Sequence, residues 1–436
     1  MTDLQTFYRA TNPSKTLAVD NEDDRKYYID FSSVRGGQII EKLRKKIAIF
    51  SPNQPTCELF TGHIGCGKST ELLRLKVDLE RSGFHVVYFE SDQDLEMSDV
   101  DISDILLAIA RRVSESLEDA GISLQPGYFQ RLFGEVKDIL QTPMELSEVE
   151  FSVGIATITS QAKASPKQRD KLRGYLEPRT NGLIEAINQE VLEPAINKLK
   201  QTGKKGLVVI VDSLDRVDSI QKPFGRLQPE YLFADRGAQL RGLSCHVVYT
   251  IPLSLRFSND FGMVTERFMT DPEVLPMVPV HLRNGSKHEK GIALLRQMVL
   301  ARAFPDLEPN QRLSKITAIF DSAESLDRLC GASGGHVRNL LRFLNDWIME
   351  EGKLPLSRNG LERMIKAQLH KLVLAITNDE WDLLGKVAKE KKVTGDDGYE
   401  ILIRSRFVYE YYDQEEPWFD VNPWGGDKRP VTLDIY

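Results

Sequence analysis

The stretch Thr61-Gly62-His63-Ile64-Gly65-Cys66-Gly67-Lys68-Ser69-Thr70 decides how this chain of 436 residues is expected to fold. It fits the pattern G-x-x-x-x-G-K-[ST], with an apolar run before it at 57–60 and helical apolar spacing after it at 71–76. The glycines let the backbone curl so that successive N–H groups point inward at phosphate oxygens. The following helix adds the positive end of its dipole. Strand, glycine-rich turn and helix together predict a site for nucleotide phosphates.

Two side chains of this loop have expected roles of their own. Lys68 is placed to reach the β- and γ-phosphates, and the Ser69 hydroxyl is expected to be a Mg²⁺ ligand. The predicted nucleotide-binding residues of the loop are Gly62, His63, Ile64, Gly65, Cys66, Gly67, Lys68, Ser69 and Thr70.

A second motif lies at 207–216, with the sequence Leu-Val-Val-Ile-Val-Asp-Ser-Leu-Asp-Arg. An apolar strand that ends in an aspartate is the Walker B pattern, and here Asp212 would hold Mg²⁺ through its water shell. Ligands bind at the carboxyl ends of the strands in such sheets, and both motifs obey that rule. The predicted metal ligands are therefore Ser69 and Asp212.

The group that activates water is open between two carboxylates. Asp215 follows the metal aspartate closely, and Glu90 comes directly after the apolar run at 84–89, which reads as a buried strand. A general base must come within about 3 Å of the attacking water. Asp215 is preferred, and its structural alternative is a cap or an ion pair with Arg216.

Two further catalytic candidates come from later strands. Thr250 lies near the end of the apolar run 245–251, where it would feel the γ-phosphate or, alternatively, bond to the backbone. Arg267 precedes the run 274–280, whose prolines predict an edge or interrupted strand. A cation there would stabilise transition-state charge on a neighbour's phosphate, and a surface arginine is the alternative.

Two more arginines are candidates for contacting the nucleotide. Arg338 follows the turn at 332–336 and is expected one turn into a helix, where it could reach back to a phosphate or face solvent. Arg35 lies in the segment 27–37, whose aromatic and small residues would suit an adenine pocket or a turn packed on the core.

Composition is that of an ordinary globular chain, with 41% hydrophobic and 28% charged residues. No run approaches the eighteen or so apolar residues of a membrane span, and the N-terminus does not read as a signal peptide. Four cysteines without a C-x-x-C pair are expected in a reducing cytoplasm. The net charge of −7 disfavours a strong general nucleic-acid binder.

The predicted fold class is α/β, a parallel P-loop NTPase sheet flanked by helices. We expect a lead-in at 1–50, a core at 51–285 with an insertion at about 122–180, a helical lid at 286–355 and a winged-helix-like unit at 356–436. Within the insertion, 149–159 alternates weakly and its structure is not settled. The hairpin expected at 407–421 is acidic and aromatic, so it is predicted to bind protein, because nucleic-acid wings are normally basic.

These motifs together resemble AAA-type P-loop ATPases of the ASCE division, in the branch that contains origin-recognition initiators and STAND signalling ATPases. The resemblance spans about 30–350, and the P-loop is similar to T-G-H-x-G-x-G-K-S-T-E-L in bacterial ATP-binding proteins. It implies ATP and Mg²⁺ as ligands, a homo-oligomer, Arg267 as an arginine finger and Arg338 as a second sensor. Many of these ATPases have Glu after the Walker B aspartate, where Ser213 stands here. That departure implies slow or conditional hydrolysis.

These motifs leave two functions open. The first is an ATPase switch whose nucleotide state sets assembly or engagement of a protein partner on the C-terminal unit. The second is an initiator-like ATPase that binds DNA through that unit. The acidic hairpin and the net charge favour the first.

Overall fold

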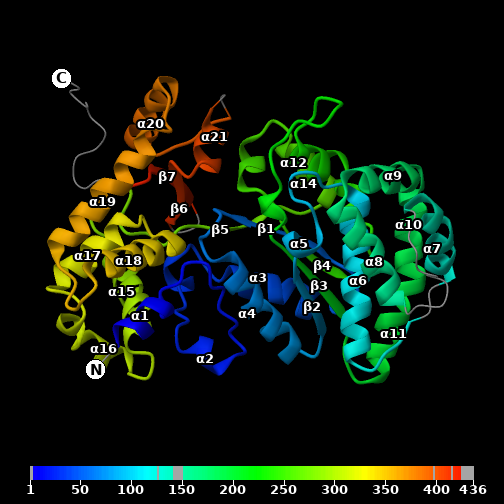
Figure 1. The fold of residues 1–436 in the computed structure, drawn as a ribbon, viewed down its shortest axis with the longest axis horizontal. Coiled ribbons are helices and arrows are strands. Elements are labelled where there is room, and N and C mark those ends of the chain that lie inside the picture. Colours follow the sequence, from blue (N-terminus) through cyan, green and yellow to red (C-terminus); the bar gives the residue numbers. More distant parts are fainter. Residues whose placement is uncertain (1–2, 125–126, 141–150, 396–397, 414–415, 424–436) are drawn as a thin grey trace. The chain divides into compact units, whose positions relative to one another are not determined.

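The computed structural model describes residues 3–124, 127–140, 151–395, 398–413 and 416–423 (Figure 1). The chain forms two compact units. The first comprises 1–39, 62–74 and 274–436, and the second comprises 40–61 and 75–273. Within the described ranges, no helix combines the length and the apolar character needed to cross a membrane. The predicted boundaries near 50, 285 and 355 stay predictions.

A five-stranded sheet with the order β2-β3-β4-β1-β5 carries both nucleotide motifs. Its strands are β1 (Cys57–Gly62), β2 (His85–Glu90), β3 (Leu207–Asp212), β4 (His246–Thr250) and β5 (Glu273–Leu275). The pairs β2–β3, β3–β4 and β4–β1 are parallel. The expected sheet is therefore confirmed. β5 is a short edge strand, and Pro276, which has no N–H to donate, follows it directly.

Alternate residues of the strands face the main core of the second unit. Val87, Phe89, Val209, Val211 and Val247 belong to one buried cluster together with α6 (Ile102–Asp119). The residues between them on β3, such as Val208 and Ile210, are also fully buried. Burial on both faces explains why these strands read as continuous apolar runs.

The insertion is mainly helical in its described residues. It contains α7 (Gly127–Leu140), α8 (Phe151–Ala164), α9 (Pro166–Leu176) and the 3₁₀ turn η4 (Glu177–Arg179). The weak alternation at 149–159 therefore does not form a strand from Phe151 onward, and 141–150 lie outside the described residues. Phe151, Ile155, Ile158 and Ala162 are buried at helical spacing, which overrides the alternation.

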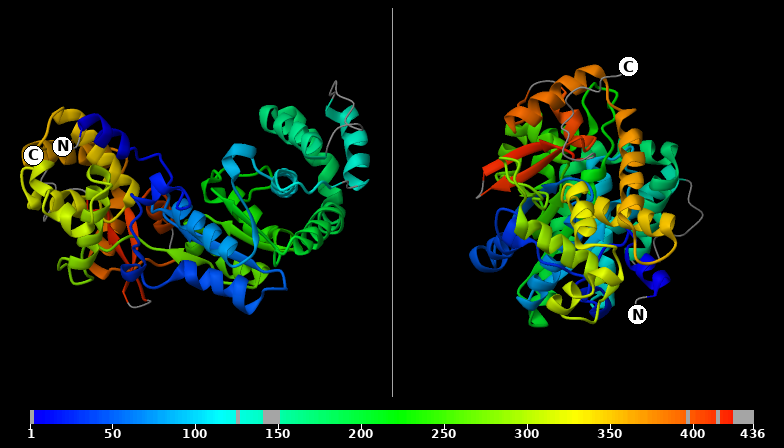
Figure 2. Two further views of the ribbon diagram at one scale, coloured as in Figure 1. Left: turned by 90° about the horizontal axis from the view of Figure 1, so that it is seen from below. Right: turned by 90° about the vertical axis from the view of Figure 1, so that its left-hand side faces the viewer.

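The insertion is followed by a long helical stretch with one irregularity. It runs as α10 (Thr180–Ala186), the π-helical turn η5 (Ile187–Leu192) and α11 (Glu193–Gln201). Figure 2 shows these helices, in cyan and green, grouped with α6. The second unit also contains α3 (Ile39–Lys45), η2 (Lys46–Phe50), α5 (Ser91–Asp94), η6 (Leu214–Arg216), α12 (Gln228–Glu230), η7 (Tyr231–Asp235), α13 (Gly237–Leu240), η8 (Leu253–Phe257) and α14 (Phe261–Phe268).

The first unit is mainly helical around its own core. Its helices are α1 (Leu4–Ala10), α2 (Glu22–Arg25), η1 (Ser32–Val34), α15 (Glu289–Ala303), α16 (Pro309–Leu313), η9 (Ile316–Ala318), α17 (Ala323–Ala332), α18 (Val337–Glu351), α19 (Arg358–Val373), α20 (Asn378–Glu390) and α21 (Tyr399–Arg404). α4 (Lys68–Arg81) also begins in this unit. Phe7, Leu295, Phe320, Leu344 and Trp347 are fully buried in one cluster.

The C-terminal hairpin forms as expected, but its acidic residues are not all on the surface. β6 (Val408–Asp413) pairs antiparallel with β7 (Glu416–Val421). Glu410 is 1% exposed and Asp420 is 9% exposed, while Glu415 lies outside the described residues. Asp420 accepts a hydrogen bond from His281 and pairs with Lys391. The prediction of an open acidic face is therefore wrong for these two carboxylates, because the hairpin packs inside its unit.

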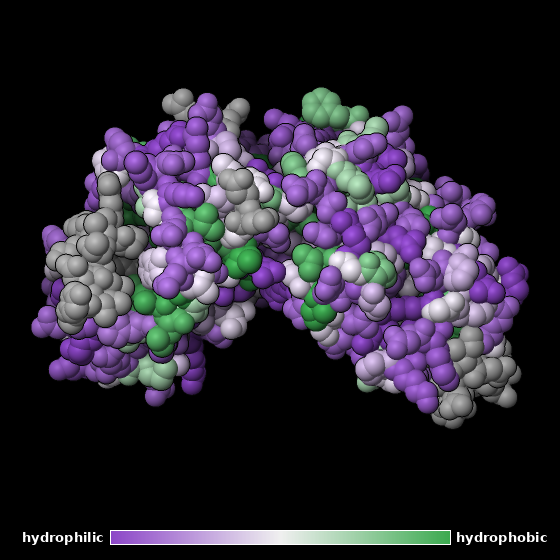
Figure 3. Space-filling model, turned by 90° about the horizontal axis from the view of Figure 1, so that it is seen from above, coloured by the Kyte–Doolittle hydropathy of each residue, from purple (hydrophilic) through white to green (hydrophobic). Residues whose placement is uncertain are grey.

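Surface side chains are mostly polar. On the face drawn in Figure 3, hydrophilic residues predominate and apolar ones form small groups. The most exposed large apolar side chains, Phe50, Met269 and Leu374, come from three separate segments of the chain. Scattered apolar residues of this kind are normal for a protein surface.

Candidate active site

The glycine-rich loop is shaped by close contacts within the first unit. Gly65 has φ 91°, and a Cβ there would lie 2.6 Å from the ring of His336, so a larger residue would collide. Gly67 has φ 108°, and the nearest atom to a Cβ there is an Arg35 nitrogen at 4.0 Å. The loop is thus packed on one side and has more room on the other, which is the side where a phosphate could approach.

Lys68 is the first residue of α4 and is 5% exposed. Its ammonium donates to the carbonyl oxygens of Gly62 at 2.7 Å and His63 at 3.0 Å. The side chain therefore folds back over its own loop. A phosphate bound at the start of α4 would compete with these carbonyls for the ammonium.

Two histidines fasten the loop to the C-terminal part of the first unit. His63 Nε2 accepts a hydrogen bond from the Glu410 N–H at 3.1 Å. His336 Nδ1 accepts from the Asn339 N–H, so its Nε2 carries the hydrogen that is donated to the Ile64 carbonyl at 2.9 Å. Burial lowers the pKa of His336 to about 3, so the ring is neutral. The loop is therefore directly bonded to β6 and to the start of α18.

Arg338 lies against the same loop, as the sequence predicted, but nearer the helix start than expected. It is the second residue of α18 rather than one turn in. Its N–H donates to the Gly65 carbonyl at 3.1 Å. The backbone bond places Arg338 beside the loop, and its predicted contact with a phosphate stays a prediction.

Arg35 is a buried cation at the loop. It is 3% exposed, donates to the Cys66 carbonyl at 2.8 Å and lies over the Phe31 ring at 5.2 Å. Its Nε is buried with no partner among the described residues, and burial lowers the pKa of the guanidinium. A buried donor of this kind is satisfied when an anion binds beside it.

The segment before Arg35 is tied to the first turn of α4. The Tyr28 hydroxyl donates to Glu71 at 3.3 Å and accepts from Arg74 at 2.9 Å. Burial raises the pKa of Glu71, although Arg35 and Arg74 oppose that shift. These contacts show that the segment packs on the P-loop helix, and its predicted contact with adenine stays a prediction.

In the second unit, two carboxylates lie side by side at the ends of β2 and β3. Glu90 and Asp212 are partners in the parallel register. Asp212 accepts from the Tyr88 hydroxyl at 2.8 Å and from the Ser213 N–H at 2.6 Å. Burial, followed by the charges of Asp212 and Asp92, raises the pKa of Glu90.

The sheet order, the glycine-rich loop before α4 and the aspartate that ends β3 decide the fold. This is a P-loop NTPase fold.

Asp215 has a different setting from Glu90. It lies in η6, just after Ser213, whose φ of 66° turns the chain away from β3. Ser213 is 1% exposed, so the side chain that follows Asp212 is buried in the protein. Arg216 pairs with Asp92 at 2.8 Å. Of the two candidates, Glu90 is the one aligned with Asp212.

Thr250 and Arg267 also differ in their surroundings. The Thr250 hydroxyl accepts from the Leu214 N–H at 3.0 Å and donates to the Val211 carbonyl at 3.3 Å. Both bonds are to the backbone, as expected for a threonine at a strand end that satisfies backbone groups rather than contacting a phosphate. Arg267 is exposed near the end of α14, as an arginine that acts on another subunit must be.

The residues expected to hold Mg²⁺ have suitable chemistry. Ser69 offers a hydroxyl in the first turn of α4, and Asp212 offers a carboxylate. Oxygen ligands of this kind suit Mg²⁺, which keeps several waters and uses few protein groups. In the described part of the chain, no cluster of three or more His, Cys, Asp or Glu residues forms a dedicated metal cage. The four cysteines are free thiols.

Sequence reasoning missed Tyr88 and His336. Tyr88 binds Asp212, and it lies two residues before Glu90 on the same strand. Strand alternation puts both side chains on one face, so a tyrosine at that spacing was an available signal. His336 is the N-cap of α18, and its bond to the loop depends on a tertiary contact that sequence does not show.

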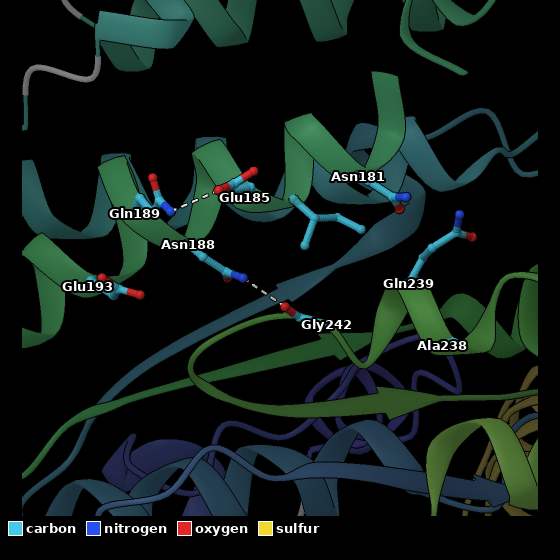
Figure 4. A pocket seen from close by; sticks show the side chains of 9 residues that line it. Asn181, Glu185, Asn188, Gln189, Glu193, Ala238, Gln239 and Gly242 are labelled. Carbon is cyan, nitrogen blue, oxygen red and sulfur yellow. Dashed lines mark hydrogen bonds between the residues drawn. The ribbon is translucent and has the colours of Figure 1, made fainter. Parts of the chain in front are cut away.

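A separate groove of about 480 Å³ lies in the second unit between η5 and the segment before β4 (Figure 4). Two of the amide side chains that line it, Asn188 and Gln189, are bonded within the protein. Asn188 donates to the Gly242 carbonyl at 2.8 Å and accepts from the Ser244 N–H, while Gln189 donates to Glu185 at 3.1 Å. The bonds of Asn188 across this groove thus hold the residues that precede β4 against η5.

No protein-family model matches the sequence, and no curated protein matches it significantly. Solved structures with a similar course of the chain include Drosophila ORC bound to DNA, at 12% identity and TM-score 0.39, covering 96% of this chain and 88% of that one. They also include the Aeropyrum pernix ORC2 protein in ADPNP–ADP complexes, at 10% identity and TM-score 0.39, covering 95% and 93%. The Aeropyrum pernix ORC1 protein in complex with DNA has 13% identity and TM-score 0.34, covering 88% of each chain. Likeness at this level says nothing about ligand, partner or reaction here.

Proposed function

We propose that this protein binds ATP with Mg²⁺ and hydrolyses it slowly, as a switch whose nucleotide state controls assembly or partner engagement. The glycine-rich loop carries the proposal. Lys68 lies at the N-terminus of α4, beside a buried Arg35 whose Nε has no partner among the described residues. Two cations and a helix N-terminus are groups that bind the oxygens of a polyphosphate. Mg²⁺, held by Ser69 and Asp212, would neutralise charge on the phosphates.

For hydrolysis we propose Glu90, ahead of Asp215, as the general base. The carboxylate takes a proton from water while the water oxygen bonds to the γ-phosphorus. The bond from that phosphorus to the β–γ bridging oxygen breaks, so ADP and phosphate leave. Burial raises the pKa of Glu90, which makes its carboxylate a stronger base.

Two features support a switch rather than a fast motor. Ser213 stands where many related ATPases carry a glutamate, and its side chain is buried. The P-loop is bonded through His63 to Glu410 on β6, so a change in the loop reaches the C-terminal hairpin directly. We propose that a protein partner engages this C-terminal unit, and that the active form is a homo-oligomer.

The test is a titration of the full chain with a fluorescent ATP analogue in the presence of Mg²⁺, with unlabelled ATP as competitor. Lys68→Ala is expected to abolish binding, because the lost charge serves the phosphates. Lys76→Ala is the matched control, since Lys76 lies on the same helix and pairs with Glu80. Unchanged affinity in Lys68→Ala, with normal circular dichroism, would remove the P-loop assignment.

A second candidate function is binding of duplex DNA by the C-terminal unit. Glu410 and Asp420 are buried, so neither contributes to an exposed acidic face that would repel DNA. Lys386, Lys389 and Lys392 are exposed or partly exposed on and just after α20. DNA binding by the full chain that weakens about 10³-fold or more between 50 and 200 mM salt would favour this function. Absence of DNA binding at the lower salt concentration would favour the first function, a switch that engages a protein partner.

A further inference from the structure

The short helix α5 begins directly after Glu90, the residue proposed as general base. Glu90 is its N-cap, and the helix is only four residues long, Ser91–Asp94. So short a helix has little stability of its own, because nucleation fixes several dihedrals for few hydrogen bonds. Glu90 ends β2 and precedes α5, so its position depends on the sheet on one side and on whatever holds α5 on the other.

A lysine from the insertion holds the end of α5. Lys163, near the end of α8, donates from Nζ to the carbonyls of Asp92 at 2.7 Å and Gln93 at 2.6 Å. These carbonyls lie at the C-terminal end of α5, where a cation is favoured by the helix dipole. Two short charge-assisted bonds to adjacent carbonyls fix both distance and direction.

Arginines hold the side chains of the same helix. Arg216, four residues beyond Asp212, donates to Asp92 at 2.8 Å. Arg112 of α6 donates to the buried Asp94 at 2.7 Å. Neither arginine belongs to the insertion, and both bind α5 through its side chains. Among the described residues, the side-chain bonds from the insertion to the α5 backbone come from Lys163.

The corner that carries Lys163 is itself fixed. Arg169 of α9 donates to the carbonyls of Ala162 at 3.0 Å and Lys163 at 3.3 Å, and to Asp99 at 2.9 Å. The end of α8 is thereby tied to the segment between α5 and α6. A displacement of α8 must break the bonds of Lys163 to α5 before it can occur.

We propose that Lys163 is a positioning residue through which the helical insertion controls hydrolysis, by holding α5 and hence Glu90 in place. The inference rests on the proposed function. A partner that shifts the insertion would release α5 and slow turnover while leaving nucleotide affinity unchanged. The insertion is then a control element on the hydrolysis step rather than on binding.

The first measurement is steady-state ATP hydrolysis by the full chain. Lys163→Met removes the donors and keeps the aliphatic stem, and kcat is expected to fall by roughly 10- to 100-fold, the effect of a misplaced catalytic group. Nucleotide Kd should stay within about twofold, since the P-loop is untouched. Lys163→Arg should restore most of kcat. The matched control is Lys198→Met, which removes a similar bond, to the Ser123 carbonyl at 2.7 Å, away from α5.

The second measurement does not depend on activity. Hydrogen exchange in a peptide covering 88–97 should be faster in Lys163→Met than in wild type, and unchanged in Lys198→Met. Unchanged exchange overturns the inference, and so does a kcat equal to wild type or a loss shared by Lys198→Met. If wild type hydrolyses no ATP although exchange responds as expected, the hydrolytic function fails while the anchoring of α5 stands.

Discussion

Glu90 and Asp212 are neighbours only because β2 and β3 pair in one particular register. The sequence predicted both strands, the metal aspartate and two base candidates, but it favoured Asp215, which is closer along the chain. Register is set by packing between strands, so it could not be read from either run alone. The pairing of Glu90 with Asp212, and the buried turn at Ser213, are the reasons why we propose Glu90 ahead of Asp215.

Substitution of each carboxylate separates the two assignments. Glu90→Gln should leave ATP affinity near normal and lower kcat by roughly 10²–10⁴, the usual contribution of a positioned base. Asp215→Asn should lower kcat much less. Single-turnover hydrolysis measures the chemical step in each variant, and a separate nucleotide titration measures the affinity for ATP. If only Asp215→Asn slows the chemical step, the two residues exchange roles.

Tyr409 of β6 accepts two hydrogen bonds at one oxygen, one from the first turn of α18 and one from the residue that follows β7. Its hydroxyl accepts from the Asn339 amide at 3.0 Å and the Asn422 amide at 2.8 Å, and all three side chains are buried. Tyr409→Phe removes the acceptor of both amides. Asn422 keeps its bond to the Arg406 carbonyl, whereas the Asn339 amide loses its acceptor, and an unsatisfied buried group costs about 1–3 kcal/mol. We expect a lower urea midpoint for the first unit.

The matched control is Tyr8→Phe, in the same unit but at the surface. Tyr8 is 36% exposed, and surface changes of this kind are usually within about 0.5 kcal/mol. Equal midpoints for Tyr409→Phe and wild type would show that water replaces the tyrosine oxygen.

Among the elements, those set by local pattern were predictable and those set by packing were not. The P-loop helix, the helices after 287 and the hairpin at 407–421 follow the periodicity of their own residues. The inward turn of Glu410 could not be read that way, because its backbone binds His63, 347 positions away in the chain. Likewise, α8 is helical because Phe151 and Ile155 share a core with α6.

The insertion is fastened to the sheet end by ion pairs at Asp99. This carboxylate accepts from Arg169 at 2.9 Å, Arg173 at 2.7 Å and Lys222 at 3.0 Å. Burial alone would raise the pKa of Asp99, but bonds from Arg173, Lys222 and Arg169 lower it overall. A lowered folded-state pKa adds stability above the unfolded value of 3.8, and that stability is lost as pH falls through the folded value.

Asp99→Asn should therefore destabilise the second unit at pH 7, and the difference from wild type should shrink in acid below about pH 3.8. The side chain is 34% exposed, so we expect about 1–2 kcal/mol, less than the roughly 3–5 kcal/mol of a buried pair. Urea melts at neutral pH and at about pH 3 measure this. Asp119→Asn changes an exposed carboxylate at the end of α6, in the same unit, and should change nothing at either pH. A pH-independent difference would contradict the role of charge.

For the assembled protein, the informative residue is Arg267. It is exposed near the end of α14, where Met263 and Met269 are also 38% and 72% exposed. An exposed arginine is free to reach the phosphate of another subunit, as an arginine finger does. We expect Arg267 to complete a site on a neighbouring subunit, so that activity per subunit rises with protein concentration.

Mixing two inactive variants tests this arrangement. Arg267→Ala should bind ATP and hydrolyse it slowly, whereas Lys68→Ala should not bind ATP but keeps its arginine. In a mixed oligomer, an intact P-loop from the first can meet an intact arginine from the second, because the two groups come from different chains. Hydrolysis should therefore recover on mixing, to at most a fraction of wild type set by random pairing. Arg267→Lys in place of Arg267→Ala serves as the control, since it keeps the charge without the planar fork and should retain intermediate activity. Wild-type turnover by Arg267→Ala at every concentration would show instead that each subunit hydrolyses ATP alone.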